Sequence, residues 1–375
     1  MRLTLVRITV AAGMAVGLLL SPKLWHTDRH YPTVPVWDGL PDVPAAGGYL
    51  VFGAMLALLA LVAVRPRARW PVLVFVAVAA GWSLWDQTRW QPWFYQYLAL
   101  LAAVSAACRY DPASEGTALN VCRLVVAATY FWSGVEKLNV SFATDIFPWL
   151  MGPALRLLPD GLAGWAEGQG WAVAVVEAGL GAALLVPRLR AAAVAGVLVM
   201  HATLLVCLGP TGHDWNSVVW PWNLALAVLD VLLFADTRGV TARHILWPPG
   251  SPLARVSLLL FGVMPAFSLV GWWDPYLSAA LYSGNTPQAR LTLTDAAAAA
   301  LPAGVREKHL SDGELDLPGW AMDELNVPGY PARRVFRGVA RRLGGPPDVT
   351  LTTLDRPNWR TGERQEIAER PDGGG

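Results

Sequence analysis

The 375-residue chain is 54% hydrophobic and only 15% charged, with 29 Lys and Arg residues against 28 Asp and Glu residues. An average soluble domain is roughly 25% charged, so this composition indicates a protein that lies mostly in a lipid bilayer. The formal net charge of +1 gives no basic surface for nucleic acid, and we expect no such partner. Cys108, Cys122 and Cys207 lack the spacing of a zinc site or a disulfide framework, so no metal is expected.

Nine apolar stretches approach the length of a membrane-spanning helix, which needs about 20 mainly apolar residues. They lie at residues 4–20, 46–64, 71–86, 92–108, 121–138, 170–187, 191–209, 217–235 and 254–273. The first stretch resembles a signal peptide, but no small-x-small cleavage pattern follows Leu20, so we expect a retained helix. The sequence therefore predicts an all-α polytopic helix bundle over residues 1–273.

Basic residues in the connections between these stretches predict the orientation. One set of connections holds Arg2, Arg7, Arg65, Arg67, Arg69, Arg109, Arg188, Arg190, Arg238 and Arg243, whereas the other holds only Lys23, Arg29, Arg89 and Arg156. Connections rich in Lys and Arg stay on the cytoplasmic side. We therefore expect a multi-pass protein of the plasma (inner) membrane with a cytoplasmic N-terminus and an extracytoplasmic C-terminal tail.

The chain beyond about residue 274 becomes rich in Pro, Gly and Arg. Arg290–Thr294 and Val349–Leu354 alternate like short strands, and Pro331–Leu343 has the pattern of a helix opened by proline. We expect a small extracytoplasmic α+β domain at residues 274–364 and a disordered tail at residues 365–375.

Polar side chains of the predicted bundle gather towards its outer end, from several separate stretches. Ionisable groups inside a bilayer are costly, and each is a functional hypothesis by default. Glu177 and His201 lie deepest, roughly 10–12 Å below the outer surface at 1.5 Å per residue, so antiparallel neighbours could pair them. The candidate catalytic residues are Lys137, Glu136, His201 and Glu177, and the candidate substrate-binding residues are Asp86, Arg89, Gln91, Asn139, His213, Asp214, Asn216, Trp222 and Asn223.

Each of these features also has a simpler interpretation. Lys137 is close enough to a helix end to extend to the lipid headgroups, and Glu177 with His201 is equally compatible with a structural pair between helices. The connection at residues 209–216 has the composition of a solvated turn, and the many Trp residues suit an interfacial aromatic belt. The gathering of all these groups at one level argues more strongly for a site than any one of them.

The segment Tyr130–Asn139, Tyr-Phe-Trp-Ser-Gly-Val-Glu-Lys-Leu-Asn, resembles the lysine-bearing helix of the vitamin K-dependent gamma-carboxylase membrane domain, the HTTM family. Trp85–Tyr97 is similar to a second motif of that family, and the run from Glu177 to His201 resembles a third more loosely. The resemblance covers about residues 80–235, and a softer form of the first motif occurs in DoxX-like membrane subunits.

The resemblance implies that Lys137 is a base acting on a hydroquinone or another lipid-soluble molecule. Two departures stand out: Asn139 replaces the family's aspartate, and Trp93 replaces the histidine that assists the chemistry. A tail of about 100 residues is also too short for the glutamate-capturing region of those enzymes. We therefore do not expect gamma-glutamyl carboxylation.

Three functions remain open from the sequence. The first is an outward-facing lyase- or oxidoreductase-type enzyme that acts on a quinol-like or lipid-linked substrate. In it Lys137 is the general base, Glu136, Asp86 and Arg89 orient it or hold a polar head, and Glu177 and His201 relay protons. The second is a non-catalytic DoxX-like subunit or assembly factor of a redox complex, with a membrane or extracytoplasmic protein partner. The third, a small-solute transporter, is less favoured because few polar residues lie in the inner half.

Overall fold

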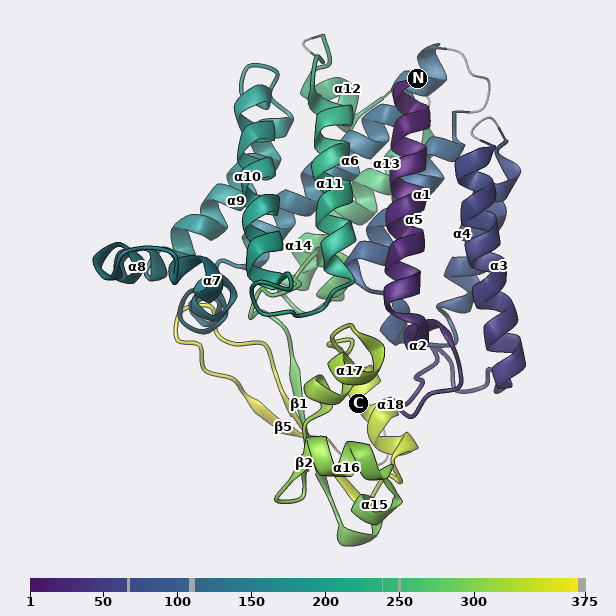
Figure 1. Cartoon of the computed structure of the whole chain (residues 1–375), viewed down its shortest axis with the longest axis vertical. Helices are drawn as coiled ribbons and strands as arrows, with labels where there is room; N and C mark the ends of the chain where they lie inside the picture. The colour runs from purple at the N-terminus through teal and green to yellow at the C-terminus, as the bar shows by residue number, and fades with distance from the viewer. Residues whose placement is uncertain (66–67, 108–111, 238, 249–250, 370–375) are drawn as a thin grey trace.

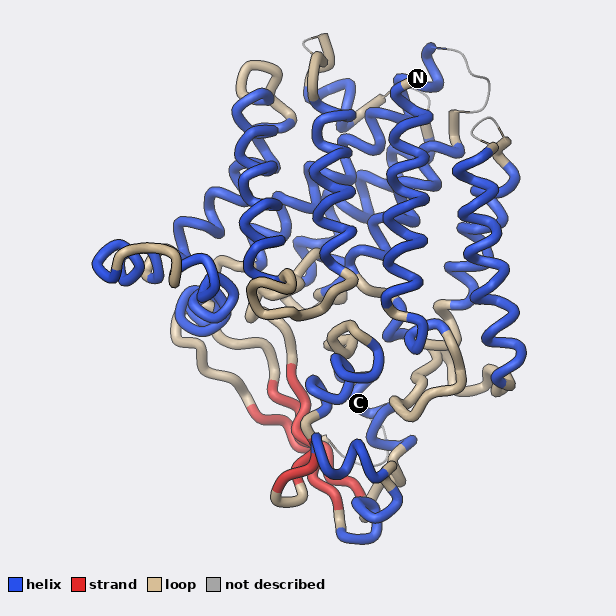
Figure 2. Tube along the Cα trace, viewed as in Figure 1, coloured by secondary structure: helices blue, strands red, loops and turns tan. Residues whose placement is uncertain are grey.

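A helix bundle with a small mixed domain at one end forms the molecule (Figure 1). The computed structural model describes residues 1–65, 68–107, 112–237, 239–248 and 251–369. Figure 2 shows that, among the residues so described, the strands lie in the small domain. The structure is mostly helical, as predicted for the bundle, but the small sheet means that the chain as a whole is not all-α.

A helix occupies each of the nine apolar stretches. Their bounds are α1 Arg2–Leu20, α3 Ala45–Val64, α4 Trp70–Trp82, α5 Pro92–Ser105, α6 Pro112–Glu136, α9 Gly170–Leu184, α10 Arg190–Leu208 and α11 Val219–Phe234, followed by a composite helix of α13 Pro252–Ser257, the π-helical η3 Leu258–Val263 and α14 Met264–Ser268. Within the described ranges, α1, α3, α6 and α10 are long and apolar enough to cross a membrane. The structure thus supports a membrane protein, whereas the count of nine spans is not confirmed.

Several of the other helices are apolar but short. The 13 residues of α4 extend about 20 Å, less than the roughly 30 Å of a bilayer core. α4 ends early because the chain turns into the 3-10 helix η1 Gln87–Arg89, where the carboxylate of Asp86 accepts a hydrogen bond from the backbone N–H of Thr88. Pro92 then starts α5 at a position where a helix tolerates proline.

The two ends of the bundle have different neighbours. The α3–α4, α9–α10 and α11–α13 connections, the last containing α12 Ala242–Leu246, lie at the end that holds the N-terminus (Figure 1). These are the connections that the sequence predicts to be cytoplasmic, although Arg67, Arg109 and Arg238 lie outside the described residues. The opposite end holds α2 Pro22–Trp25, η1, the π-helical η2 Phe142–Ile146, α7 Phe147–Leu155, α8 Asp160–Glu167 and the small domain. The predicted orientation is compatible with this arrangement and stays a prediction.

The small domain contains a five-stranded antiparallel sheet in the order β2-β3-β1-β4-β5. Its elements are η4 Tyr276–Ser278, β1 Gln288–Leu293, α15 Asp295–Ala300, α16 Ala303–His309, β2 Leu310–Ser311, β3 Glu314–Leu315, α17 Leu317–Leu325, α18 Arg333–Arg342, β4 Val349–Leu354 and β5 Glu366–Ala368. Leu291 pairs with Leu351 across β1 and β4, and both side chains are buried because alternate residues face the helices.

Strands and a helix lie where the alternation and the proline predict them, at β1, β4 and α18. The short strands β2 and β3 carry no comparable alternation and were not predicted. β5 lies in the range that the sequence predicts to be disordered, and it pairs with β4. Residues 370–375 of that range lie outside the described part of the chain.

Polar contacts attach the small domain to the end of the bundle. Asn326, in the left-handed conformation at the end of α17, donates to Ser217 Oγ at 2.6 Å and to the Leu20 carbonyl at 2.9 Å. The carboxylate of Glu324 accepts hydrogen bonds from the backbone N–H groups of His30 at 2.6 Å and Tyr31 at 2.9 Å. The domain therefore covers the end of the bundle at which the candidate polar residues gather.

Candidate functional site

A small cavity of about 80 Å³ lies between α6, α9, α10 and α11. Five of the candidate residues line it, namely Lys137, Glu177, His201, Trp222 and Asn223. Its other walls are mostly apolar and include Leu204 and Leu226. Leu150 of α7 and the segment at residues 279–282, which follows the last helix of the bundle, complete the lining.

Close packing of α6 against α9 places the two charged residues of the cavity side by side. A Cβ atom on Gly134 would lie 2.3 Å from the backbone nitrogen of Ala178, and one on Gly181 would lie 2.4 Å from that of Phe131. Any larger side chain would therefore separate the helices. Lys137 follows Gly134 by one turn and Glu177 precedes Gly181 by one turn, so the contact brings them together.

Lys137 and Glu177 form a nearly buried ion pair. The Lys137 Nζ atom donates to both carboxylate oxygens of Glu177, at 2.6 and 2.8 Å, and to Ser133 Oγ at 2.8 Å. The two side chains are 11% and 10% exposed. An ammonium group has three N–H donors, and all three are used here. A charged ammonium beside the Glu177 carboxylate satisfies all three contacts, and in that state its nitrogen has no lone pair available.

His201 belongs to a second network in the same cavity. Its Nε2 atom lies 2.6 Å from the Tyr130 hydroxyl, and its Nδ1 atom lies 2.8 Å from Asn223 Oδ1. The Tyr130 hydroxyl is also 2.6 Å from Asp230 Oδ2. Glu177 and His201 thus share a cavity but have different partners, so the suggested pairing between them is wrong.

Sequence reasoning missed Asp230, which is completely buried on α11. A signal was present, because this is an acidic residue inside the apolar stretch at residues 217–235. It lies nearer the inner end of that stretch, away from the level at which the other polar residues gather. Tyr130, which connects Asp230 to the cavity, is the first residue of the segment Tyr130–Asn139, and the sequence predicted no role for it.

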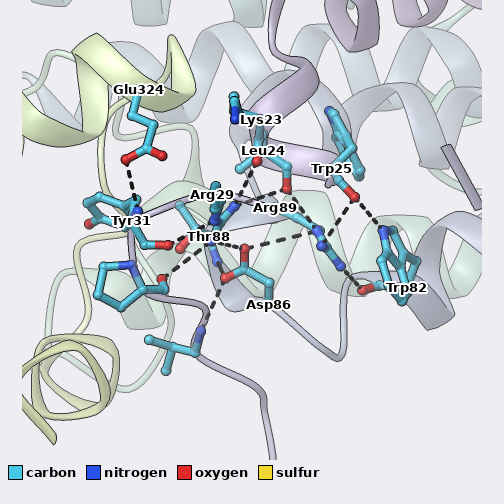
Figure 3. Close-up of polar contacts among 12 residues, drawn as sticks. Lys23, Leu24, Trp25, Arg29, Tyr31, Trp82, Asp86, Thr88, Arg89 and Glu324 are labelled. Atoms are coloured by element: carbon cyan, nitrogen blue, oxygen red, sulfur yellow. Dashed lines mark hydrogen bonds and ion pairs between the residues drawn. The ribbon is translucent and has the colours of Figure 1, made fainter. Parts of the chain in front are cut away.

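Asp86 and Arg89 lie in a separate cluster among the connections at the end of the bundle that carries the small domain (Figure 3). Asp86 pairs with Arg29 at 2.5 Å, and both side chains are fully buried. The Arg89 guanidinium donates to the backbone carbonyls of Leu24 at 3.0 Å and Trp82 at 2.5 Å. Burial lowers the pKa of Arg89 to about 9, against the opposing effect of Asp86. This cluster joins α2, η1 and α4. The charged groups of Asp86 and Arg89 already have partners within the protein, so the cluster has a structural role.

Gln91 has a similar structural role, since its side-chain amide donates to the Thr88 carbonyl at 2.9 Å and the Pro328 carbonyl at 3.0 Å. It therefore ties η1 to the small domain.

Glu136 and Asn139 hold the segment that completes the cavity. Glu136 accepts a hydrogen bond from Asn285 Nδ2 at 2.6 Å. Asn139 Nδ2 donates to the Ser283 carbonyl at 2.9 Å, and its Oδ1 accepts from the Phe142 backbone N–H at 2.8 Å. Both residues therefore position residues 279–285 above the ion pair.

The predicted residues of the α10–α11 connection divide into two groups. Asn216 Nδ2 donates to the Tyr282 hydroxyl at 2.8 Å, which connects it to the cavity lining. His213 stacks on Trp149 at 4.6 Å between ring centroids, and its Nε2 lies 2.6 Å from the Trp149 carbonyl. Asp214 is exposed. His213 and Asp214 thus lie outside the lining.

Comparison with known proteins identifies no relative. No family model matches the chain, no curated protein is similar to it, and no solved structure matches its fold. Any function must therefore be argued from the cavity itself.

The ionisable side chains that line this cavity are suited to charge pairing and proton transfer. In the described part of the chain, no group of three or more His, Cys, Asp and Glu side chains could hold a metal ion. Cys122 and Cys207 are free and buried, and Cys108 lies outside the described residues. The ammonium, the carboxylate, the phenol and the imidazole are the groups that can act on a bound molecule.

Proposed function

We propose that this chain is a membrane enzyme that holds the polar head of a lipid-soluble substrate, quinol-like or lipid-linked, in the cavity and transfers a proton there. The observation that carries the proposal is the presence of two polar networks, Lys137–Glu177 and Tyr130–His201, on the walls of one apolar cavity. Paired ionisable groups inside a membrane protein are costly and are retained mainly at functional sites.

The size of the cavity favours a small polar head. Its volume of about 80 Å³ is below the roughly 150 Å³ of a cavity that takes up benzene. A hydroxyl or carboxyl group fits beside Lys137, whereas the apolar part of the substrate would remain among the helices. Leu204 and Trp222 supply an apolar wall at this point.

Lys137 can act as a base only after it loses a proton. In the proposed step the ammonium gives one proton to the Glu177 carboxylate, and the resulting amine takes the proton of a substrate O–H group. The product is a substrate oxyanion beside an ammonium, with a neutral Glu177. An apolar environment reduces the difference in energy between the charged and the neutral pair, because burial disfavours both charges.

The resemblance to the gamma-carboxylase membrane domain supports the choice of Lys137, which occupies the position of that family's lysine. Trp93, at the position of the family's histidine, is buried beside Trp25 with ring centroids 6.2 Å apart. It packs the bundle, so an assisting group must come from elsewhere in the cavity.

The test is retention and deprotonation of a lipid-soluble molecule by the protein in lipid nanodiscs. The wild type is expected to retain such a molecule, detected by mass spectrometry of an organic extract, and to ionise the O–H group of an added quinol, detected by the ultraviolet absorbance of the quinolate. Lys137→Met should lose both properties, whereas Lys23→Met, the same change at an exposed lysine, should keep both. Equal retention and equal ionisation in the three proteins would refute the proposal.

A second function, a non-catalytic DoxX-like membrane subunit, is favoured by α8. This helix has no buried residue and projects sideways from the bundle (Figure 1). Leu162 and Trp165 are 48% and 64% exposed, an apolar surface that suits a partner protein. Purification in mild detergent should then yield a stoichiometric partner that Trp165→Glu releases, and a chain that always migrates alone would exclude this function.

A further inference from the structure

Three buried side chains from three helices meet at one hydroxyl group. Tyr130 of α6, His201 of α10 and Asp230 of α11 are between 0% and 3% exposed. The Tyr130 oxygen lies 2.6 Å from His201 Nε2 and 2.6 Å from Asp230 Oδ2. The ion pair of Lys137 and Glu177 does not include any of these atoms, so Tyr130, His201 and Asp230 form a separate network.

The neighbouring amide determines which imidazole nitrogen carries a hydrogen. Asn223 Nδ2 donates to the Val219 carbonyl at 2.7 Å, and a carbonyl can only accept. Asn223 Oδ1 must therefore be the atom that faces His201 Nδ1 at 2.8 Å. Because that oxygen also only accepts, His201 Nδ1 carries a hydrogen.

Two arrangements of hydrogens then satisfy both short contacts of Tyr130. In the first, Tyr130 donates to the Asp230 carboxylate and accepts from the Nε2–H of a cationic His201. In the second, Tyr130 donates to the Nε2 lone pair of a neutral His201 and accepts from the carboxylic O–H of Asp230. Both arrangements contain the same number of protons, and each leaves every contact with one donor and one acceptor.

Removal of one proton leaves a contact unsatisfied. With a neutral His201 and an ionised Asp230, the single Tyr130 hydrogen can serve only one neighbour, and two acceptors then face each other at 2.6 Å. The other carboxyl oxygen, Asp230 Oδ1, has no hydrogen-bond partner among the residues that the structure describes. A buried carboxylate would leave that charged oxygen unpaired, which favours the second arrangement with a neutral carboxyl group.

We propose that Tyr130, His201 and Asp230 hold one exchangeable proton and pass it between the carboxyl group and the imidazole. The Asp230 proton moves to the Tyr130 oxygen while the Tyr130 hydrogen moves to His201 Nε2, so no electron acceptor or donor is required. Tyr130 and His201 both line the cavity that contains Lys137 and Glu177. The use of this proton for substrate chemistry rests on the proposed function, whereas its presence does not.

Infrared spectroscopy of the protein with isotope-labelled aspartate, in lipid nanodiscs, tests the bound proton. The wild type should show the C=O band of a protonated aspartic acid. Asp230→Asn should remove this band, and Asp236→Asn, which changes an exposed aspartate at the end of the same helix, should leave it in place. A wild-type spectrum without a band that depends on Asp230 would overturn the proposal.

Exchange of the same proton with D₂O tests the transfer. Tyr130→Phe removes the connecting oxygen and should slow the exchange by about 10²-fold or more, the usual contribution of a positioned proton-transfer group. His201→Gln should slow it similarly while the band persists, which provides a second variant if Tyr130→Phe does not fold. Exchange at the wild-type rate in a folded variant would overturn the transfer. These results do not depend on Lys137→Met, so a failure of the proposed function would be recognised separately.

Discussion

At the scale of single residues, Asp86 shows how an acidic side chain is accommodated without solvent. Its carboxylate pairs with Arg29, and it also accepts from the backbone N–H groups of Thr88 at 3.1 Å and Val34 at 3.4 Å. These contacts replace the water that the carboxylate loses on burial. They also explain why Asp86 has a structural role among the connections between the helices and does not line the cavity.

Removal of Asp86 should therefore destabilise the protein strongly. Asp86→Ala leaves Arg29 buried without its partner, a change that typically costs about 3–5 kcal/mol in free energy of unfolding. Asp38→Ala is the matched control, because Asp38 pairs with Arg341 at 2.8 Å but is 67% exposed, and such pairs contribute less than about 1 kcal/mol. Denaturant unfolding followed by Trp fluorescence measures both, and equal losses would contradict the burial argument.

His26 makes the stability depend on pH. The ring contacts Tyr49 and Phe52 at centroid distances of 4.4 and 4.8 Å, and burial, followed by the nearby charge of Lys23, lowers its pKa below the usual value of 6.5. The unfolded chain then takes up a proton at a higher pH than the folded protein. Stability is therefore fully present above about pH 6.5 and falls as the pH falls from that value to the folded pKa.

His26→Gln should reduce this acid sensitivity. The difference in melting temperature between about pH 7.5 and about pH 5.5 is expected to be smaller in the variant than in the wild type. Differential scanning fluorimetry at the two pH values measures it. An unchanged difference would mean that His26 does not contribute.

At the scale of elements, the contact between α6 and α9 is the one on which the cavity depends. Gly181 faces the backbone of α6, while a Cβ atom added to Gly179 on the same helix would have no neighbouring atom within 4 Å. Gly181→Ala should destabilise the protein by about 1–3 kcal/mol, as overpacking usually does. Gly179→Ala should be neutral or stabilising, because alanine is the better helix former. Thermal unfolding of the two variants measures the difference. Similar melting temperatures would contradict the close approach of α9 to α6 at Gly181.

The helices could be predicted from the sequence because apolar stretches and proline starts are local signals. The ends of α4 and the short length of several helices could not be predicted from the sequence. They depend on contacts such as that between Arg89 and the Trp82 carbonyl. Lys137, Glu177 and His201 were identified because they are polar groups in apolar surroundings. Their partners were not identified, because a sequence does not state which helices are neighbours. Asp230 was missed for a different reason, since it lies nearer the inner end of its apolar stretch than the other polar residues do.

At the scale of the whole molecule, the Lys137–Glu177 pair and the polar cluster around Asp86 lie towards the end of the bundle that carries the small domain. The arginine-rich connections lie at the other end (Figure 1). The predicted orientation, which stays a prediction, would place the cavity nearer the extracytoplasmic side.

Cysteine labelling tests the orientation in a background without the three native cysteines. His213→Cys and Asp312→Cys, the latter in the turn between β2 and β3, should react with an impermeant maleimide added to intact cells. Arg65→Cys, in the connection after α3, should react only after permeabilisation. Labelling of Arg65→Cys and His213→Cys from the same side would contradict the arrangement.

The cavity can be completed only late in biosynthesis, because its lining includes residues 279–282. The four helices that form its walls all precede this segment, and Glu136 and Asn139 can engage Asn285 and Ser283 only after the ribosome has added them. We therefore expect that Lys137 is accessible in a nascent chain that has not yet reached Ser283. A chain that stalled before this point would leave the Lys137–Glu177 pair exposed to water and lipid.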